Sequence, residues 1–140
     1  MTRSDAGSDE LRILIQKLSR RIRANRAGDG ITDGQLSVLV HLDKNGARSP
    51  GQIADHEHVT PPSMNRTINA LEDAGLVTRT PSADDGRKVL IDLTDTGREI
   101  ISETRRLRTA WFTQLLAELS PAERRALEEV TPILRRLADS

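Results

Sequence analysis

The chain has 140 residues, which suits one domain and leaves too little length for two catalytic domains. Because hydrophobic residues make up 36% and the only aromatic residues are Trp111 and Phe112, the core must consist of Leu, Ile, Val and Ala, which favours helices over a sandwich or barrel. The absence of cysteine excludes disulfides, thiolate zinc sites and thiol redox switches, and the net charge of zero neither indicates nor forbids a polyanionic partner.

The first predicted helix lies within residues 8–30. Ser8 is the expected N-cap, and the glycines of residues 27–30 are expected to end the helix. Its basic residues outnumber its acidic ones. This excess of positive charge is either an ordinary solvated face or part of a surface that binds a polyanion. Apolar residues recur at steps of three and four, which is the spacing of one helical stripe: Leu11, Leu14, Ile15, Leu18 and Ile22.

Three helices follow in the middle of the chain. Thr32 is the expected cap of a helix that stops at Asn45-Gly46. Ser49-Pro50 and Thr60-Pro61 each place an N-cap before a proline at the first helical position, and they predict helices to about residues 58 and 74. The short separation of these two helices is typical of a helix-turn-helix connection.

A hairpin and two long helices complete the chain. Residues 77–82 and 89–94 have the composition of strands, and ADDGRK (83–88) between them predicts the turn. Thr94 and Ser120 are the expected caps of the last two helices, and Glu123 completes a capping box. The terminal helices carry more apolar surface than a small winged domain covers, which predicts a homodimer. Its expected contacts are Leu11, Leu14, Leu18, Leu127, Val130 and Leu134.

The helix expected at 61–74 has two different faces. Met64, Ile68 and Leu71 share one face, which we expect to be buried. The opposite face carries Asn residues suited to bidentate contact with adenine and an Arg suited to guanine or phosphate, while small residues near the helix start let the backbone approach a phosphate. The alternative is an ordinary polar helix surface. The candidate DNA-binding residues of this helix are Thr60, Pro62, Ser63, Asn65, Arg66 and Asn69.

The hairpin turn offers a second set of candidates. Arg87 and Lys88 lie beside Asp84 and Asp85, and a guanidinium at a hairpin tip can enter a narrow minor groove. The neighbouring carboxylate of Asp85 can orient this guanidinium through a bidentate pair. The alternative is a surface turn in which the charges cancel. Cations and acids are nearly equal in number between residues 44 and 92, so affinity for a polyanion must come from the placement of a few cations.

The stretch SPGQIADHEHVTPPSMNRTINALEDAGLVTRTPSADDGRKVLIDLTDTG (49–97) resembles the winged-helix signature of the MarR regulators. In that signature two short helices lead to "LE..GLV.R", a wing with "D.R" and a closing "LT..G"; the match is close over roughly residues 36–97. The resemblance implies a homodimeric bacterial transcription factor, usually a repressor, whose recognition helix and wing contact a palindrome. It places Asn65, Arg66 and Asn69 in the recognition helix, and Asp85 and Arg87 in the wing. Gly86 departs from the pattern, since many members carry a second Arg there.

The resemblance also implies an effector site, because small aromatic acids or other effectors bind family members where the dimer helices meet the winged domain. Arg20, Arg23, His41 and Trp111 are the candidates here. His41 is otherwise expected to be a buried histidine with satisfied hydrogen bonds.

No catalytic, metal or cofactor site is expected. The DHEH run at 55–58 spreads its side chains around a helix and lacks an i, i+4 pair of histidines, so we expect a solvated surface rather than a metal site. The sequence contains no GxSxG elbow, P-loop or dinucleotide fingerprint. An enzyme is therefore not expected.

These patterns together predict a mostly helical α+β fold, a winged helix-turn-helix with N- and C-terminal dimerisation helices. We expect a single domain over 1–140, with dimerisation helices at about 8–30 and 98–140 and the DNA-binding part at about 32–97. The predicted function is ligand-released repression at a pseudo-palindromic duplex operator. The alternatives are a dimeric winged-helix module that binds protein, and a metal-sensing repressor. The expected location is the cytoplasm of a bacterium, at the nucleoid when bound to DNA, because no apolar stretch is long enough for a membrane span or signal peptide.

Overall fold

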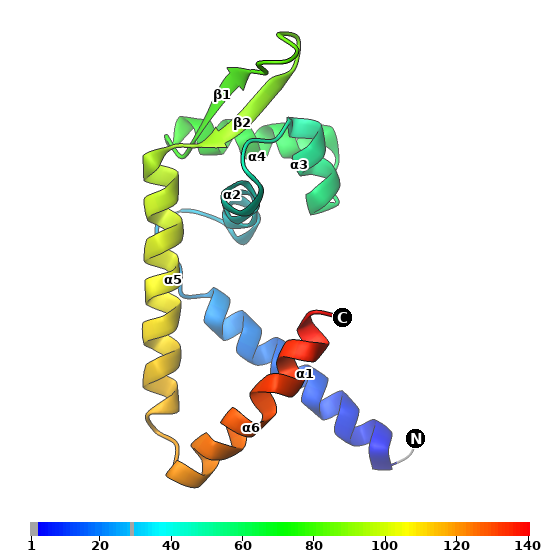
Figure 1. Cartoon of the computed structure of the whole chain (residues 1–140), viewed down its shortest axis with the longest axis vertical. Helices are drawn as coiled ribbons and strands as arrows, with labels where there is room; N and C mark the ends of the chain where they lie inside the picture. Colours follow the sequence, from blue (N-terminus) through cyan, green and yellow to red (C-terminus); the bar gives the residue numbers. More distant parts are fainter. Residues whose placement is uncertain (1–2, 29) are drawn as a thin grey trace. The chain divides into compact units, whose positions relative to one another are not determined.

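The computed structural model describes residues 3–28 and 30–140, which form two compact units. The central unit is Arg23–Leu107, and the terminal unit combines the chain up to Ile22 with Arg108–Ser140. Figure 1 shows the elements in chain order. They are α1 (Arg3–Arg23), α2 (Asp33–Asn45), α3 (Pro50–Glu57), α4 (Pro61–Asp73), β1 (Val77–Pro81), β2 (Val89–Leu93), α5 (Asp95–Leu116) and α6 (Pro121–Ala138).

The helix starts within and after the central unit follow the predicted capping signals. The side-chain oxygens of four N-cap residues accept hydrogen bonds from backbone N–H groups three residues later, which satisfies donors that the first helical turn leaves unpaired. Three of the four form reciprocal capping boxes. The N-caps are Thr32 for α2, Ser49 for α3, Thr60 for α4 and Ser120 for α6.

The predicted limits of α1 were wrong at both ends. The helix begins at Arg3, so Ser8 lies inside it instead of capping it. It ends at Arg23, before the glycines of residues 27–30. Beyond this end, Ala27 is buried and its backbone N–H donates to Oγ1 of Thr104 at 3.0 Å, a bond between residues far apart in the sequence. This tertiary contact holds the chain in a non-helical conformation that local periodicity does not indicate.

The hairpin of β1 and β2 is antiparallel, with Val77 opposite Leu93 and Pro81 opposite Val89. Arg48 extends it, because its backbone exchanges hydrogen bonds with Ile91 at 3.1 and 2.7 Å. The segment before α3 is thereby fixed to the middle of β2. In Figure 1 the hairpin projects from the part of the central unit that contains α3 and α4.

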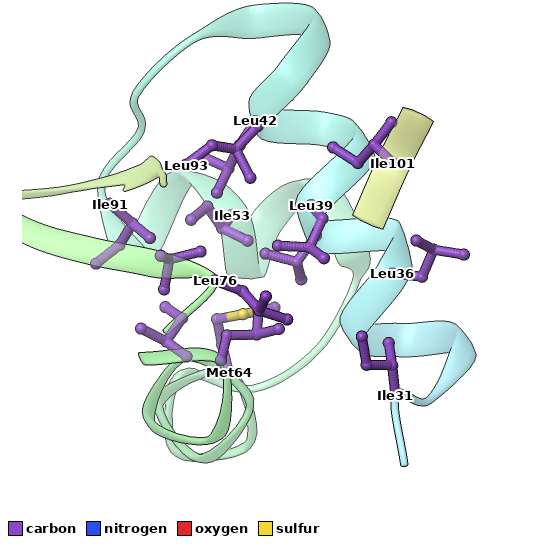
Figure 2. Packing of buried hydrophobic residues seen from close by; sticks show 14 of the residues in the cluster. Ile31, Leu36, Leu39, Leu42, Ile53, Met64, Leu76, Ile91, Leu93 and Ile101 are labelled. Atoms are coloured by element: carbon purple, nitrogen blue, oxygen red, sulfur yellow. The ribbon is translucent and has the colours of Figure 1, made fainter. Parts of the chain in front are cut away.

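The core of the central unit is aliphatic, as the composition predicted. Ile53 of α3, Ile68 of α4 and Ile91 of β2 have no exposed side-chain surface, and Leu39 of α2 is equally buried. Figure 2 shows how these helices and the hairpin contribute to one cluster, with Ile101 of α5 at its edge. Fully burying each such side chain contributes about 1.5–3 kcal/mol. This cluster fixes the backbone of α4 and of the wing base.

The wing joins α5 through a tight corner. The Thr94 hydroxyl donates to the Gly75 carbonyl at 2.7 Å and accepts from the N–H of Gly97 at 3.1 Å, so Thr94 caps α5 as predicted. At Gly97 a Cβ atom would lie 2.3 Å from the carbonyl oxygen of Leu76. Only glycine fits this close approach between α5 and the chain before β1.

The terminal unit contains no buried residue within the part of the chain that the structure describes. Its apolar stripes are present as predicted, but they face solvent, with exposures from 37% at Phe112 to 60% at Leu137. No helix of the described residues is long and apolar enough to cross a membrane. The exposed apolar residues of α1 and α6 include Leu11, Ile13, Leu14, Ile15, Leu18, Leu127, Val130, Ile133, Leu134 and Leu137.

Candidate nucleic-acid interface

The two faces of α4 are divided as the sequence predicted. Met64, Ile68 and Leu71 are at most 2% exposed and pack into the core. The opposite face is exposed, and its candidate residues are Pro62, Asn65, Arg66 and Asn69. The core therefore holds the helix by one side and leaves the polar side accessible.

The first turn of α4 uses its small polar residues locally. The Thr60 hydroxyl accepts from the N–H of Ser63 at 3.3 Å, which makes Thr60 the N-cap. The Ser63 carbonyl accepts from the hydroxyl of Thr67 at 3.3 Å, and Ser63 is half-buried. These two candidates thus shape the start of the helix, where backbone N–H groups favour an anion.

Asn69 has a partner, whereas Asn65 and Arg66 on the same face have none within the described residues. Its Oδ1 accepts a hydrogen bond from Nη2 of Arg79, which lies on β1. Nε of Arg79 is also 3.5 Å from a carboxylate oxygen of Glu72, one turn after Asn69. Glu72 and Arg79 occupy the E and the R of the signature "LE..GLV.R", but nothing in that pattern predicts that Arg79 contacts Asn69.

The wing turn differs from the expected Asp–Arg side-chain pair. Oδ1 of Asp85 accepts from the backbone N–H of Arg87 at 3.0 Å, and the Asp85 carbonyl accepts from the N–H of Lys88 at 3.0 Å. Within the described residues, the Asp85 carboxylate forms no ion pair with the Arg87 guanidinium. Asp85 organises the turn backbone, because its short side chain reaches the N–H two residues later.

Three cations on this surface have no internal partner. Within residues 3–28 and 30–140, the side chains of Arg66, Arg87 and Lys88 form no hydrogen bond or ion pair, and the Asn65 amide forms none either. Arg79, by contrast, is partly neutralised by Glu72. The unpaired cations therefore lie on the exposed face of α4 and at the wing tip.

A polar hollow of about 550 Å³ lies between the start of α3 and the turn end of the wing. Arg48 and Lys88 contribute cations to its wall, and Asp84 contributes an acid. Arg48 is half-buried, and its guanidinium donates to the Ala47 carbonyl at 2.9 Å. From the sequence, Arg48 was only one of the cations between residues 44 and 92; its place before the Ser49 cap was the signal that could have singled it out.

The four effector candidates divide between the units. Arg20 and Trp111 belong to the terminal unit, and Arg23 and His41 to the central unit. The guanidinium carbon of Arg21 lies 5.2 Å from the Trp111 ring centroid. The cation over this ring is therefore Arg21, which was not among the candidates, and not its neighbour Arg20. Arg21 and Trp111 line an open hollow of about 300 Å³ within the terminal unit.

His41 is half-buried and stacks on His56, with ring centroids 3.8 Å apart. Its Nδ1 lies 3.0 Å from the amide nitrogen of Asn45. Burial lowers the pKa of His41 below its ordinary value, His56 and Arg48 lower it further, and Glu57 opposes the shift. Part of the DHEH run thus packs α3 against α2. Within residues 3–28 and 30–140, no group of three or more His, Cys, Asp or Glu residues could hold a metal ion.

The sequence comparisons identify the family. The family model described as MarR family matches residues 31–89. An uncharacterized HTH-type transcriptional regulator of Mycobacterium bovis is 37% identical over 140 residues, which cover 99% of this chain and 98% of that relative. A match of this length includes the helices on both sides of the wing as well as the wing itself.

Solved structures agree with the fold. Rv1404 from Mycobacterium tuberculosis has a TM-score of 0.83 at 23% identity, covering all of this chain and 97% of that chain. A MepR mutant of S. aureus, solved with an oligodeoxyribonucleotide, has a TM-score of 0.73 at 22% identity, covering 93% and 96%. The mostly helical α+β prediction with a two-stranded wing is confirmed. The order of the elements and the sequence relatives lead to one conclusion: the chain belongs to the MarR family of winged-helix transcriptional regulators, which are not enzymes.

Proposed function

We propose that this regulator binds a pseudo-palindromic duplex operator as a homodimer, represses nearby genes and leaves the operator when a small ligand binds. The observation that carries the proposal is the set of polar and cationic side chains on the exposed face of α4 and at the wing tip that have no partner among the described residues. Asn65 and Arg66 have the donors and acceptors that base edges in the major groove require. Arg87 and Lys88 supply charge for phosphates or a narrow minor groove.

The MepR structure supports DNA as the partner, because that protein of similar fold was solved with an oligodeoxyribonucleotide. The charge balance of this chain adds a restriction. With the net charge at zero, attraction to DNA comes from the three unpaired cations rather than from a bulk field. We therefore expect moderate non-specific affinity and a specific component that depends on base contacts.

The exposed apolar stripes of the terminal unit support the homodimer. A helix such as α6 with no buried residue gains little stability from its own apolar face, so burial against another surface is required. A second copy offers the same stripes, and a two-fold interface joins identical patches. Leu11, Leu14, Leu18, Leu127, Val130 and Leu134 remain our proposed principal contacts.

For the effector we propose an aromatic carboxylate, with Arg20, Arg23, His41 and Trp111 as candidate contacts. The support is the chemistry of the chain: an indole with a guanidinium over its ring, together with further arginines at the end of α1. Such a ligand releases the operator only if it binds the DNA-incompetent state more tightly. Calorimetry with a panel of aromatic acids tests this part, and binding without a change in operator affinity contradicts it.

The direct test of the DNA surface compares single variants on one operator probe. Arg66→Ala should weaken binding and relax preference at its base position, at about 1–3 kcal/mol for a bidentate contact. Arg87→Ala should weaken binding across operator variants and reduce the slope of log affinity against log salt by about one. Arg106→Ala is the control, since Arg106 lies on α5 and pairs with Glu103.

Two outcomes favour the rival functions. A folded dimer without affinity for any duplex indicates a module that binds protein. Loss of operator affinity after treatment with a chelator indicates a metal-sensing repressor, whereas an unchanged affinity and melting temperature contradict that rival.

A further inference from the structure

Arg79 contacts Asn69, one of the candidate DNA-binding residues of α4. Arg79 lies on β1, yet its Nη2 donates to Oδ1 of Asn69 on α4. Glu72, three residues after Asn69, holds the same guanidinium through Nε at 3.5 Å. The guanidinium is thus held between a carboxylate and an amide on adjacent turns of the recognition helix.

The chemistry of arginine determines which way the Asn69 amide points. A guanidinium has N–H donors and no acceptor, so the amide atom that faces it must be the oxygen. The Nδ2 group of Asn69, with two donors, is then turned away from Arg79. The exposed position of Asn69 leaves these donors accessible.

This arrangement changes what Asn69 can recognise. Bidentate contact with adenine requires the amide oxygen to accept from N6 while the nitrogen donates to N7. In this structure Arg79 occupies one of the two acceptor positions of that oxygen, so an adenine N6 donor would have to share Oδ1 with a cation. The remaining donors match base edges that offer acceptors, which are O6 and N7 of guanine or O4 of thymine.

We propose that Arg79 is a specificity-determining positioning residue: by occupying Oδ1 of Asn69, it makes Asn69 a donor that prefers guanine or thymine over adenine. The inference rests on the proposed function, since it concerns the base contacted by α4. It departs from the sequence-based expectation that Asn69 suits adenine. Stability is a poor explanation for the cluster, because Arg79 and Glu72 keep 33% and 43% of their side-chain surface exposed and such pairs contribute little.

The test measures base preference at every position of a randomised duplex library. Asn69→Ala first identifies the position that Asn69 contacts, as the position where preference disappears. At that position the wild type should favour guanine or thymine. Asn69→Asp keeps an acceptor for Arg79 but removes the Nδ2 donors, so it should lose the same preference.

Two Arg79 variants then separate positioning from a general role in the strand. Arg79→Met removes the donor and keeps an unbranched side chain, and it should shift this single position towards adenine by about fivefold or more. Arg79→Lys keeps a donor and should retain the wild-type preference. Thr80→Val is the control, because Thr80 is exposed on the same strand and the change preserves a β-branched side chain. Thermal unfolding of each variant verifies that the fold is intact.

The outcomes are distinguishable. An Arg79→Met protein that is folded, binds duplex and keeps the wild-type preference overturns this inference alone. A uniform loss of affinity without a change in preference also overturns it, since Arg79 then serves the strand and not Asn69. A wild-type protein without affinity for duplex contradicts the proposed function, and this inference fails with it.

Discussion

The Asp85 carboxylate accepts a hydrogen bond from the backbone N–H of Arg87, with 3.0 Å between Oδ1 and N. The same residue's carbonyl accepts from the N–H of Lys88, whose own carbonyl accepts from Ser82 at 2.8 Å. Asp85 thereby shapes the turn from which the Arg87 guanidinium projects. The acid acts on the conformation of the wing tip and leaves the guanidinium unpaired within the described residues.

The effect of a substitution at Asp85 on operator affinity should therefore depend on whether the new side chain keeps a hydrogen-bond acceptor, and not on its charge. Asp85→Asn keeps an oxygen that accepts from Arg87, so operator affinity should stay within about twofold of the wild type. Asp85→Ala removes the acceptor and should weaken binding by about 0.5–1.5 kcal/mol, the net contribution of one hydrogen bond. Fluorescence anisotropy with a labelled operator measures both. Equal losses in the two variants would show that the charge is what matters.

A charge placed in the apolar surface of α6 should prevent dimerisation. Val130→Asp puts a carboxylate into the proposed interface, where burying an unpaired charge is costly. Val89→Asp is a matched control, because both valines are 39% exposed and Val89 belongs to the wing. Sedimentation equilibrium at micromolar concentration should give a monomer for Val130→Asp and a dimer for Val89→Asp. A dimer in both cases would remove α6 from the interface.

Gly97→Ala should destabilise the central unit. The new Cβ would lie 2.3 Å from the backbone oxygen of Leu76, so α5 or the chain before β1 must shift. We expect a loss of about 1–3 kcal/mol, as in other overpacked sites. Gly34→Ala in α2 is the control, since its nearest neighbouring atom is 3.9 Å away, and it should gain up to about 1 kcal/mol. Urea unfolding measures both, and unchanged stability of Gly97→Ala would refute the steric argument.

Stability should fall in mild acid because of His41. Its pKa is lowered in the folded protein, chiefly by burial and then by His56, so the unfolded chain binds a proton more readily. The contribution of neutral His41 to the stability of the folded protein is complete above the unfolded pKa of about 6.5. It declines as the pH falls through that value towards the folded pKa. His41→Gln should reduce this decline in urea midpoints measured between pH 8 and pH 5.

The control for this effect is His58→Asn. His58 ends α3 in the left-handed region, with φ of 55°, which asparagine tolerates. It lies outside the His41–His56 stack. This variant should keep the acid-induced decline. A His41→Gln protein with the wild-type pH dependence would exclude His41 as its source.

The features predicted correctly from sequence are those set by residues close together in the chain. The caps at Thr32, Ser49 and Ser120 use a backbone N–H three residues away, and local spacing is enough to recognise them. The buried face of α4 follows from the helical period of Met64 and Ile68. The family resemblance added the order of elements around them.

The features that were missed depend on tertiary contacts or on competing local ones. Ser8 carries a capping side chain, but the residues before it continue the helix to Arg3. The hydrogen bond from Arg79 to Asn69 joins a strand to a helix, and the two residues are ten positions apart in the sequence. Neither helical nor strand periodicity predicts a contact at that separation. The Asp85 carboxylate could bind either the backbone N–H or the guanidinium of Arg87. It accepts from the backbone N–H, which its short side chain reaches directly.

The central claim is that α4 and the wing bind duplex DNA through a few placed cations in a dimer. Its most direct test is equilibrium binding of the wild type to a duplex from the DNA flanking its own coding region, chosen for an inverted repeat and measured over a series of salt concentrations. We predict two protomers per duplex and a log–log decline of affinity with a slope of about −0.9 for each phosphate neutralised. No affinity for the duplex at any salt concentration, from a protein shown to be folded and dimeric, would contradict the account.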